Sequence, residues 1–295
     1  MKEFECIAAE RYNLAEGPVW SPRHQALYWV DIRKPAVHRY VFATREVQGW
    51  PMPDLVGSLA VCDTGGLLVA VRGGLSFFDP ASGTFEMVAN PEADLPDHRF
   101  NDGKCDRAGR FWVGSMHNTL RGEFSGFLYR LDRKRGCVRM ADGIAIPNSL
   151  AWSRDDRTMY FANTYRRTIF AYDFDIESGG IDDRRVFAPA AGRPGAPDGS
   201  TVDADNFLWN AVYGGGRLDR YAPDGRLDCE VRLPMSQPTS CAFGGPSLET
   251  LYVTSATQHM SEEDLAHQPF AGAIIALDVG VRGLPEPYFA RSAKG

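Results

Sequence analysis

Residues 148–163 read NSLAWSRDDRTMYFAN, which is a short apolar run, a polar turn and a second apolar run. This pattern is typical of two neighbouring antiparallel strands joined by a turn. Similar segments occur at residues 17–32, 58–71, 102–115, 199–212 and 240–255. Equivalent apolar residues of the six segments lie 41 to 50 residues apart, the period of a four-stranded propeller blade. The repeats therefore predict an all-β fold, a six-bladed β-propeller of four-stranded antiparallel blades.

One position of the repeat carries an oxygen-bearing acid or amide in four of the six copies. Taking Trp20, Val61, Cys105, Trp152, Val202 and Phe243 as anchors, the residues four places earlier are Glu16, Gly57, Asn101, Asn148, Asp198 and Thr239. In a propeller the innermost strands line a central channel, so these positions are expected to converge at one mouth of it. Clustered oxygen donors suit a divalent cation such as calcium, magnesium or manganese. Asp and Asn are also ordinary turn formers, which leaves a local structural role open.

Composition limits the classes of protein to consider. The chain has 295 residues, 44% of them hydrophobic, and no linker or composition shift divides it, so residues 1–295 are expected to form a single propeller domain. A net charge of −6 without a basic stripe argues against a nucleic-acid partner. No apolar run approaches the length of a membrane span. The six cysteines show no paired spacing and the N-terminus has no signal-peptide pattern, which favours a reduced, cytoplasmic protein. A monomer or weak homodimer is expected.

Two segments outside the repeats have predicted roles. The strand-like residues 4–9 precede the first repeat and are expected to pair with the last blade, because a closed ring needs its ends fastened. Residues 261–267 are the one helix-like stretch, with Ser261 as its cap.

Familiar catalytic motifs are missing from the sequence. It contains no GxSxG elbow, no HExxH pair and no Walker loop. Among the histidines only His117 stands out, at the end of a strand that would open onto the channel mouth, and a structural role is the alternative.

A polar stretch, HRFNDGK at residues 98–104, surrounds the third register position. The planar guanidinium group of Arg99 can donate several hydrogen bonds to a polyhydroxylated or anionic ligand. The alternative is that Arg99 forms an ion pair on the surface. Asp102 is expected either to support a substrate site beside Asn101 or to form a turn. Lys104 is expected to face solvent.

These residues and the segments around them resemble the SMP-30/gluconolactonase/luciferin-regenerating family. The resemblance covers nearly the whole chain and rests on four motifs: AEGPVW (15–20), RFNDGKCDRAGRFWVGSM (99–116), IPNSLAWSRDDRTMYFANT (146–164) and PDGSTVDADNFLW (197–209). It implies a six-bladed propeller with one divalent metal ion held by Glu16, Asn148 and Asp198. It also implies that Arg99 and Asn101 contact the substrate.

The chain departs from the family at one loop. Relatives similar to the animal gluconolactonase carry an acidic pair after the strand that ends here at His117. This chain reads MHNTLRGE at that point, which places His117, Asn118 and Thr119 beside the substrate and leaves the identity of the sugar open.

The resemblance implies a metal-dependent hydrolase that opens a sugar (aldono-) lactone to the aldonic acid. Its cofactor would be one divalent ion: calcium, zinc, magnesium, manganese or ferrous iron. Such an ion polarises the lactone carbonyl, and Asp198 is the expected general base. One alternative is a hydrolase similar to phosphotriesterases or arylesterases, with a more apolar pocket. The other is a non-catalytic propeller, either a metal-binding (calcium-binding) module or a protein-docking module, and a docking module would show an exposed apolar patch.

Overall fold

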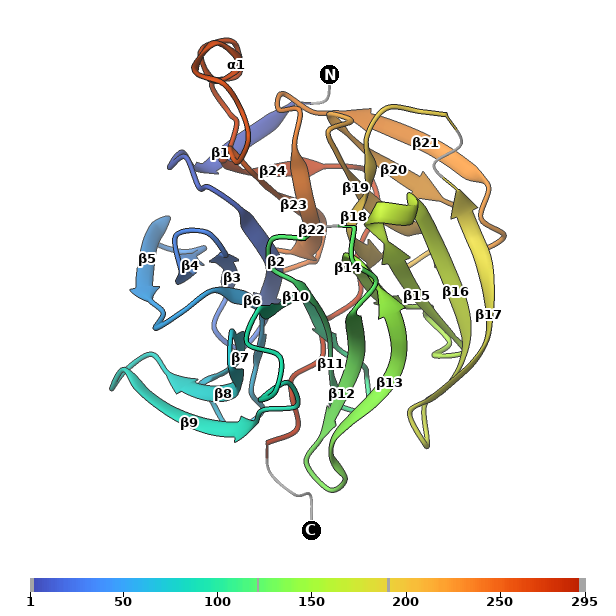
Figure 1. Ribbon diagram of the computed structural model, residues 1–295. Helices are drawn as coiled ribbons and strands as arrows, with labels where there is room; N and C mark the ends of the chain where they lie inside the picture. Colours follow the sequence, from blue (N-terminus) through green and yellow to red (C-terminus); the bar gives the residue numbers. More distant parts are fainter. Residues whose placement is uncertain (1–2, 121, 190–191, 292–295) are drawn as a thin grey trace.

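Six four-stranded antiparallel sheets surround a central axis in the computed structural model, which describes residues 3–120, 122–189 and 192–291 (Figure 1). This arrangement confirms the six-bladed propeller predicted from the repeats. None of the described helices is long and apolar enough to cross a membrane. All six cysteines are free thiols.

In each of the first five blades the strands are hydrogen-bonded in chain order. The first blade contains β2 (Ala15–Ser21), β3 (Ala26–Asp31), β4 (Ala36–Val41) and β5 (Glu46–Pro51). The second contains β6 (Val56–Val61), β7 (Leu67–Val71), β8 (Gly74–Asp79) and β9 (Thr84–Ala89). The third contains β10 (His98–Cys105), β11 (Phe111–His117), β12 (Gly126–Asp132) and β13 (Gly136–Ile144).

The fourth blade contains β14 (Pro147–Trp152), β15 (Thr158–Asn163), β16 (Thr168–Asp175) and β17 (Gly180–Pro189), with the short 3-10 helix η1 (Thr164–Arg166) after β15. The fifth contains β18 (Ala196–Val202), β19 (Leu208–Tyr213), β20 (Arg217–Tyr221) and β21 (Leu227–Arg232). The sixth contains β22 (Pro238–Gly244), β23 (Thr250–Ser255) and β24 (Ile274–Asp278), and it is completed by β1 (Phe4–Ala8).

The first strand of the chain closes the ring, as predicted. β1 pairs with β24 in antiparallel register, with Phe4 opposite Leu277 and Cys6 opposite Ile275. The predicted helix is also present as α1 (Glu262–His267), between β23 and β24, with Ser261 as its cap.

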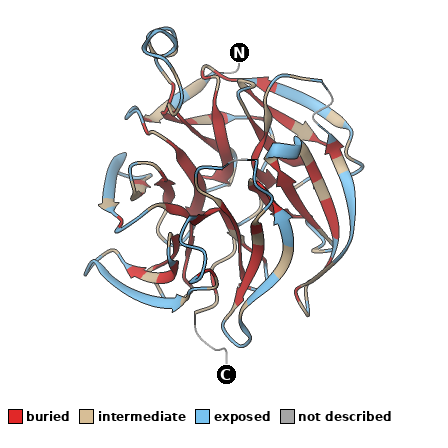
Figure 2. Cartoon of the chain, viewed as in Figure 1, coloured by how far each residue is buried: buried red, intermediate tan, exposed pale blue. Residues whose placement is uncertain are grey.

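Burial falls from the axis to the rim of each blade. Every residue of β2, β6, β14 and β22 is buried, whereas β5 and β9 are mostly exposed. Figure 2 shows the same gradient, with buried strands around the centre and pale blue strands outside. The inner strands are covered by neighbouring blades on both faces, so they read as nearly continuous apolar runs with polar exceptions. Those polar exceptions are the candidates for function.

Every inner strand carries a β-bulge at the predicted register position. The pairing register shifts between Glu16 and Val19 in β2, and between Asn148 and Ala151 in β14. Shifts occur at the equivalent points of the other four inner strands, β6, β10, β18 and β22. A bulge bends the strand and re-aims the side chains beside it. In a regular strand the side chains alternate in direction, and those at the register position would point between blades. The bulges turn these side chains towards the channel instead.

Residues 279–291, which we call the C-terminal strap, cross the opposite end of the channel. The red segment of Figure 1 shows this path to the C-terminus. Phe289 donates its N–H to Val61 O of the second blade, and Ala290 donates to Gly109 O of the third. Gly283 donates to Leu248 O of the sixth blade.

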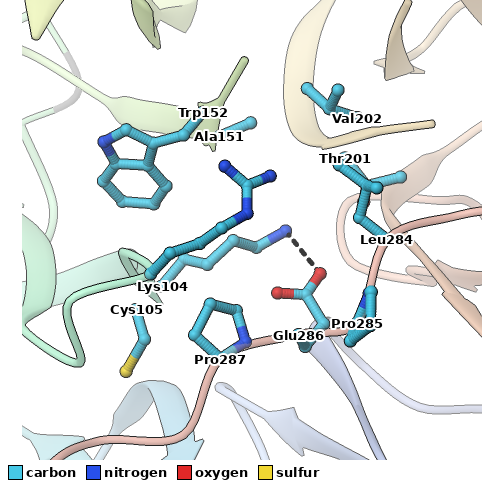
Figure 3. Close-up of a pocket in the computed structure, with 11 residues that line it drawn as sticks. Lys104, Cys105, Ala151, Trp152, Thr201, Val202, Leu284, Pro285, Glu286 and Pro287 are labelled. Atoms are coloured by element: carbon cyan, nitrogen blue, oxygen red, sulfur yellow. Dashed lines mark hydrogen bonds and ion pairs between the residues drawn. The ribbon is translucent and has the colours of Figure 1, made fainter. Parts of the chain in front are cut away.

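Lys104 contacts the strap and does not face solvent, contrary to the prediction from the sequence. Its Nζ donates to Ser200 O at 2.9 Å and lies 3.3 Å from Glu286 Oε1 of the strap, with only 12% of its side chain exposed. Figure 3 shows the lysine pointing at this carboxylate rather than into solvent. The prediction was wrong because the strap has no repeat period, so the repeats gave no sign that it covers this end of the channel.

Candidate functional site

The predicted oxygen donors meet in one cavity of about 140 Å³ at the mouth of the channel. The residues that line it are Leu14, Glu16, Arg33, Arg99, Asn101, Met116, Ile146, Asn148, Thr164, Asp198, Tyr213 and Gln258. All four register residues and Arg99 are among them, and each of these five is at most 5% exposed. The structure therefore brings together side chains from four blades that lie up to 182 residues apart in the chain, as Glu16 and Asp198 do.

Arg99 and the two asparagines form a hydrogen-bonded chain. Arg99 Nη1 donates to Asn101 Oδ1 at 2.7 Å, and Asn101 Nδ2 donates to Asn148 Oδ1 at 3.0 Å. Asn101 Nδ2 also donates to Pro147 O at 2.9 Å. These bonds fix the planes of both carboxamides before any ligand arrives.

Thr164 sets the direction of the Asn148 carboxamide. Asn148 Nδ2 donates to Thr164 Oγ1 at 2.8 Å, and Thr164 Oγ1 in turn donates to Pro197 O at 2.7 Å. Because the amide nitrogen is held by η1, Oδ1 faces the cavity side occupied by Asn101. A carbonyl oxygen has two lone pairs, and Asn101 uses one of them. Partners that orient a ligand in this way strengthen metal sites.

Glu16 and Asp198 are buried close to the Arg99 guanidinium, and the carboxyl group of Asp102 is buried near both of them. Burial raises the pKa of Glu16 to about 8, and the charge of Asp102 acts in the same direction. Burial also raises the pKa of Asp198 well above its usual value, with the charges of Glu16 and Asp102 adding to the effect and Arg99 opposing it. The pKa of Asp102 is raised by burial as well, although its Oδ2 accepts the Leu150 N–H at 3.0 Å. Without a bound cation, ionisation of these buried carboxyl groups is therefore energetically unfavourable.

These residues fit a divalent cation. Asp198 Oδ1 is buried and accepts no hydrogen bond from the described residues. No group of three or more His, Cys, Asp or Glu side chains in the described part of the chain is arranged to hold a metal ion. The cavity lining adds the carboxamide oxygen of Asn148 to the carboxylates of Glu16 and Asp198, and calcium, magnesium and manganese accept such oxygens readily.

The two remaining register positions have structural roles. A Cβ atom on Gly57 would lie 2.4 Å from Phe100 O, so β10 packs against β6 too closely for any side chain. Thr239 Oγ1 donates to Ala15 O at 2.5 Å and shares a hydrogen bond with Thr254 Oγ1. The second and sixth blades thus hold the ring together at this level, and the other four blades supply the oxygen donors.

The loop at residues 117–119 lies beside the cavity without lining it. His117 Nδ1 accepts the N–H groups of Thr119 and Leu120, which is a turn-forming role. Asn118 Oδ1 accepts from Arg33 Nη1 at 3.1 Å, so this residue acts on the cavity through Arg33. Asp102 also stands behind the cavity, where it ties β10 to β14.

Sequence reasoning missed four polar residues of the cavity: Arg33, Thr164, Tyr213 and Gln258. They stand at or just after the ends of β3, β15, β19 and β23. Each of these strands runs antiparallel to an inner strand that starts at the channel mouth, so each ends there. Considering the last residue of every second strand of the repeat, together with the three residues that follow it, would have included all four.

Comparisons with known proteins agree on one family. The sequence profile of the SMP-30/Gluconolactonase/LRE-like region matches residues 14–257. The chain is 36% identical over 287 residues to 6-deoxy-6-sulfogluconolactonase of Pseudomonas putida, covering 97% of this chain and 98% of that protein. It is 37% identical over 292 residues to L-arabinolactonase of Azospirillum brasilense, covering 98% and 96%. The structure of a calcium-binding protein, regucalcin, from Agrobacterium tumefaciens superposes with a TM-score of 0.94 at 30% identity, covering 98% and 97%.

Proposed function

This chain belongs to the SMP-30/gluconolactonase/LRE-like family, and from that premise we propose that it is a metal-dependent hydrolase that opens a sugar lactone to the aldonic acid. The names of the two lactonase relatives support hydrolysis of a sugar lactone. The observation that carries the proposal is the polar cavity itself, in which buried Glu16 and Asp198 face Arg99 and two asparagines. Nine of its twelve lining residues are polar or charged, which suits a polyhydroxylated substrate better than an apolar ester.

Glu16, Asn148 and Asp198 are the proposed ligands of the divalent ion. When bound, the ion supplies polarisation of the lactone carbonyl and stabilises the negative charge that develops on its oxygen. The ligand oxygens would be Asn148 Oδ1, which is oriented through Thr164, and the carboxylates of Glu16 and Asp198. Glu16 mainly balances charge, because its Oε2 already accepts the Gly17 N–H at 3.1 Å.

Asp198 is the proposed general base. Its carboxylate takes a proton from the attacking water. The water oxygen adds to the carbonyl carbon, the ring C–O bond breaks, and the proton passes to the departing ring oxygen. One water is consumed and one hydroxy acid is formed.

Arg99 and Asn101 orient the substrate. Their hydrogen bond leaves them side by side in the cavity wall, where a guanidinium and a carboxamide can bind adjacent hydroxyl groups. Gln258 Oε1 is buried and has no hydrogen-bond partner among the described residues, so it is a further acceptor for a hydroxyl group.

Calcium binding without catalysis is the second candidate function. It is favoured by the likeness to a structure described as that of a calcium-binding protein. An ion-binding site needs the oxygen donors but has no use for a buried arginine beside them, which raises the electrostatic cost of binding a cation. Arg99 therefore favours the hydrolase.

The test is acid release from a panel of aldonolactones by protein stripped with a chelator and reloaded with calcium, magnesium, manganese, zinc or ferrous iron. We expect at least one lactone to be hydrolysed, activity to be lost on stripping, and at least one ion to restore it. Calcium binding with no acid release under any ion would favour the second candidate. Faster hydrolysis of an aryl ester or a phosphotriester than of every lactone would overturn the assigned substrate class.

A further inference from the structure

Gln258 lines the candidate cavity from the sixth blade, shortly after β23 ends at Ser255. Its N–H donates to Asn13 O at 3.0 Å, and its carbonyl oxygen accepts from Gln237 Nε2 at 3.2 Å. Asn13 belongs to the segment between β1 and β2, where the ring of blades closes. The main chain at Gln258 is therefore held at the junction of the sixth and first blades, and only the side chain is left to act in the cavity.

The carboxamide of Gln258 differs from the other two carboxamides of the cavity. Asn101 and Asn148 are both tied by hydrogen bonds within the protein. Gln258 Oε1 is buried, and it has no hydrogen-bond partner among the described residues. A buried polar atom without a partner costs free energy, so such atoms are usually matched by water or by a ligand. Because Gln258 lines the cavity, its partner is expected to be whatever fills the cavity.

The ring of blades places Gln258 across the cavity from Arg99 and Asn101. Each inner strand contacts the inner strand of the next blade, and β2 contacts β22 to close the ring. In such a ring of six the third blade lies opposite the sixth, as Figure 1 shows for β10 and β23. Arg99 and Asn101 belong to β10 of the third blade. A ligand in the cavity therefore lies between these two residues and Gln258.

We propose that Gln258 is a specificity-determining residue, which binds a hydroxyl group on the edge of the lactone opposite to the edge bound by Arg99 and Asn101. The proposal rests on the lactonase function and adds a requirement on the substrate. A carboxamide both donates and accepts hydrogen bonds, as a hydroxyl group does, whereas a guanidinium only donates. A site that pairs with a hydroxyl group rejects an analogue without it, because a buried polar group of the protein then stays unpaired.

The experiment compares lactones that differ by one hydroxyl group. The substrates are the aldonolactone that the wild-type protein hydrolyses fastest and its analogues that each lack one hydroxyl group. The variants are Gln258→Met, which keeps the length of the side chain, and Gln258→Ala, which does not. Gln48→Met is the matched control, because Gln48 lies exposed on the outer strand β5 and does not line the cavity. Melting temperatures check that each variant is folded.

We expect one of the deoxy analogues to be hydrolysed by the wild-type protein with a kcat/KM about 10- to 100-fold below that of the parent lactone. Gln258→Met and Gln258→Ala should lower kcat/KM on the parent by a similar factor, and on that analogue by less than about threefold, because the lost contact is the same. Gln48→Met should behave as wild type. If both Gln258 variants lowered kcat/KM by the same factor on the parent and on every analogue, or had no effect, the proposal would be overturned.

A binding measurement separates this proposal from the hydrolase function. Calorimetry with metal-loaded protein compares aldonates with their analogues that each lack one hydroxyl group. A preference for the complete aldonate over one analogue that disappears in Gln258→Met, but not in Gln48→Met, supports the role of Gln258 even if no lactone is hydrolysed. Hydrolysis in which the Gln258 variants discriminate among the analogues as the wild type does refutes the role of Gln258 and leaves the lactonase intact.

Discussion

At the scale of single residues, Asp198 and Glu16 are both buried carboxyls of one cavity, and their proposed roles differ. Asp198→Asn keeps an oxygen at the cavity and removes the proton acceptor, so turnover should fall by about 100-fold or more. Glu16→Gln should mainly weaken metal binding, and excess metal should restore much of its activity. Steady-state rates across a metal titration check both. If saturating metal returned Asp198→Asn to the wild-type rate, Asp198 would be a ligand only and the base would lie elsewhere.

The raised pKa values of the same two groups predict how stability depends on pH without metal. Both carboxyls bind protons more tightly in the folded protein than in the unfolded chain, where their pKa values are near 4. The stabilisation that the protonated groups contribute is complete below that value and is lost as the pH rises towards 8, the value to which the pKa of Glu16 is raised.

The melting temperature of metal-stripped protein should therefore fall between pH 5 and pH 8. The double variant Glu16→Gln/Asp198→Asn is the control, and its melting temperature should fall less over the same range. Saturating divalent metal should stabilise the wild-type protein more at pH 8 than at pH 5, because the ion must displace protons at the lower pH. Identical pH profiles for wild type and double variant would contradict the assigned burial.

At the scale of structural elements, the bulged inner strands determine where the site residues stand. Gly57 in β6 faces the bulge of β10, and a Cβ atom there would lie 2.4 Å from Phe100 O and 2.8 Å from Asn101 N. Its backbone is not in the left-handed region, so Gly57→Ala acts by contact alone. We expect a destabilisation of about 1–3 kcal/mol together with reduced kcat/KM, since β10 must move and takes Asn101 with it.

Gly180→Ala in β17 is the matched control. Its Cβ atom would meet only the Ser178 hydroxyl at 3.1 Å, which has to shift by only a few tenths of an ångström. Chemical denaturation and lactone hydrolysis check the pair. A Gly57→Ala protein that lost stability but kept wild-type kcat/KM would show that the site does not depend on the packing of β6 against β10.

The elements also show how far the sequence could be read. The repeat of apolar runs predicted six blades, and its register predicted which inner-strand residues share the channel mouth, because both follow from local periodicity. The bulges could not be predicted from residue types. Gly17 and Ser149 both adopt the left-handed conformation at the bulge, but one is a glycine and the other a serine, so no common residue marks the position. Arg33 also escaped, because its reach depends on Asn118 two blades away. The periodicity of the repeats predicts where the backbone of each strand lies. The contacts of long side chains and the paths of irregular segments can be seen only in the folded structure.

At the scale of the whole molecule, the C-terminal strap forms hydrogen bonds to several blades and so links them in addition to the connecting loops. It is hydrogen-bonded to the second, third, fifth and sixth blades, through Phe289, Ala290, Arg282 and Gly283, and Tyr288 binds the turn of the first blade. Phe289 is 1% exposed and packs with Cys62, Leu68 and Phe111 between the second and third blades. A closed ring can open at any one interface between blades, so a segment that ties most of the blades raises the cost of opening at each.

Phe289→Ala should therefore lower the free energy of unfolding by about 3–5 kcal/mol, the usual loss for a buried phenylalanine. Phe85→Ala, on the outer strand β9 and 40% exposed, removes the same side chain and should cost less. Because the strap crosses the end of the channel opposite the cavity, kcat/KM of Phe289→Ala measured well below its melting temperature should match wild type. Loss of activity in fully folded Phe289→Ala would mean that the strap shapes the cavity through the inner strands, and a stability loss no larger than that of Phe85→Ala would mean that it does not hold the ring.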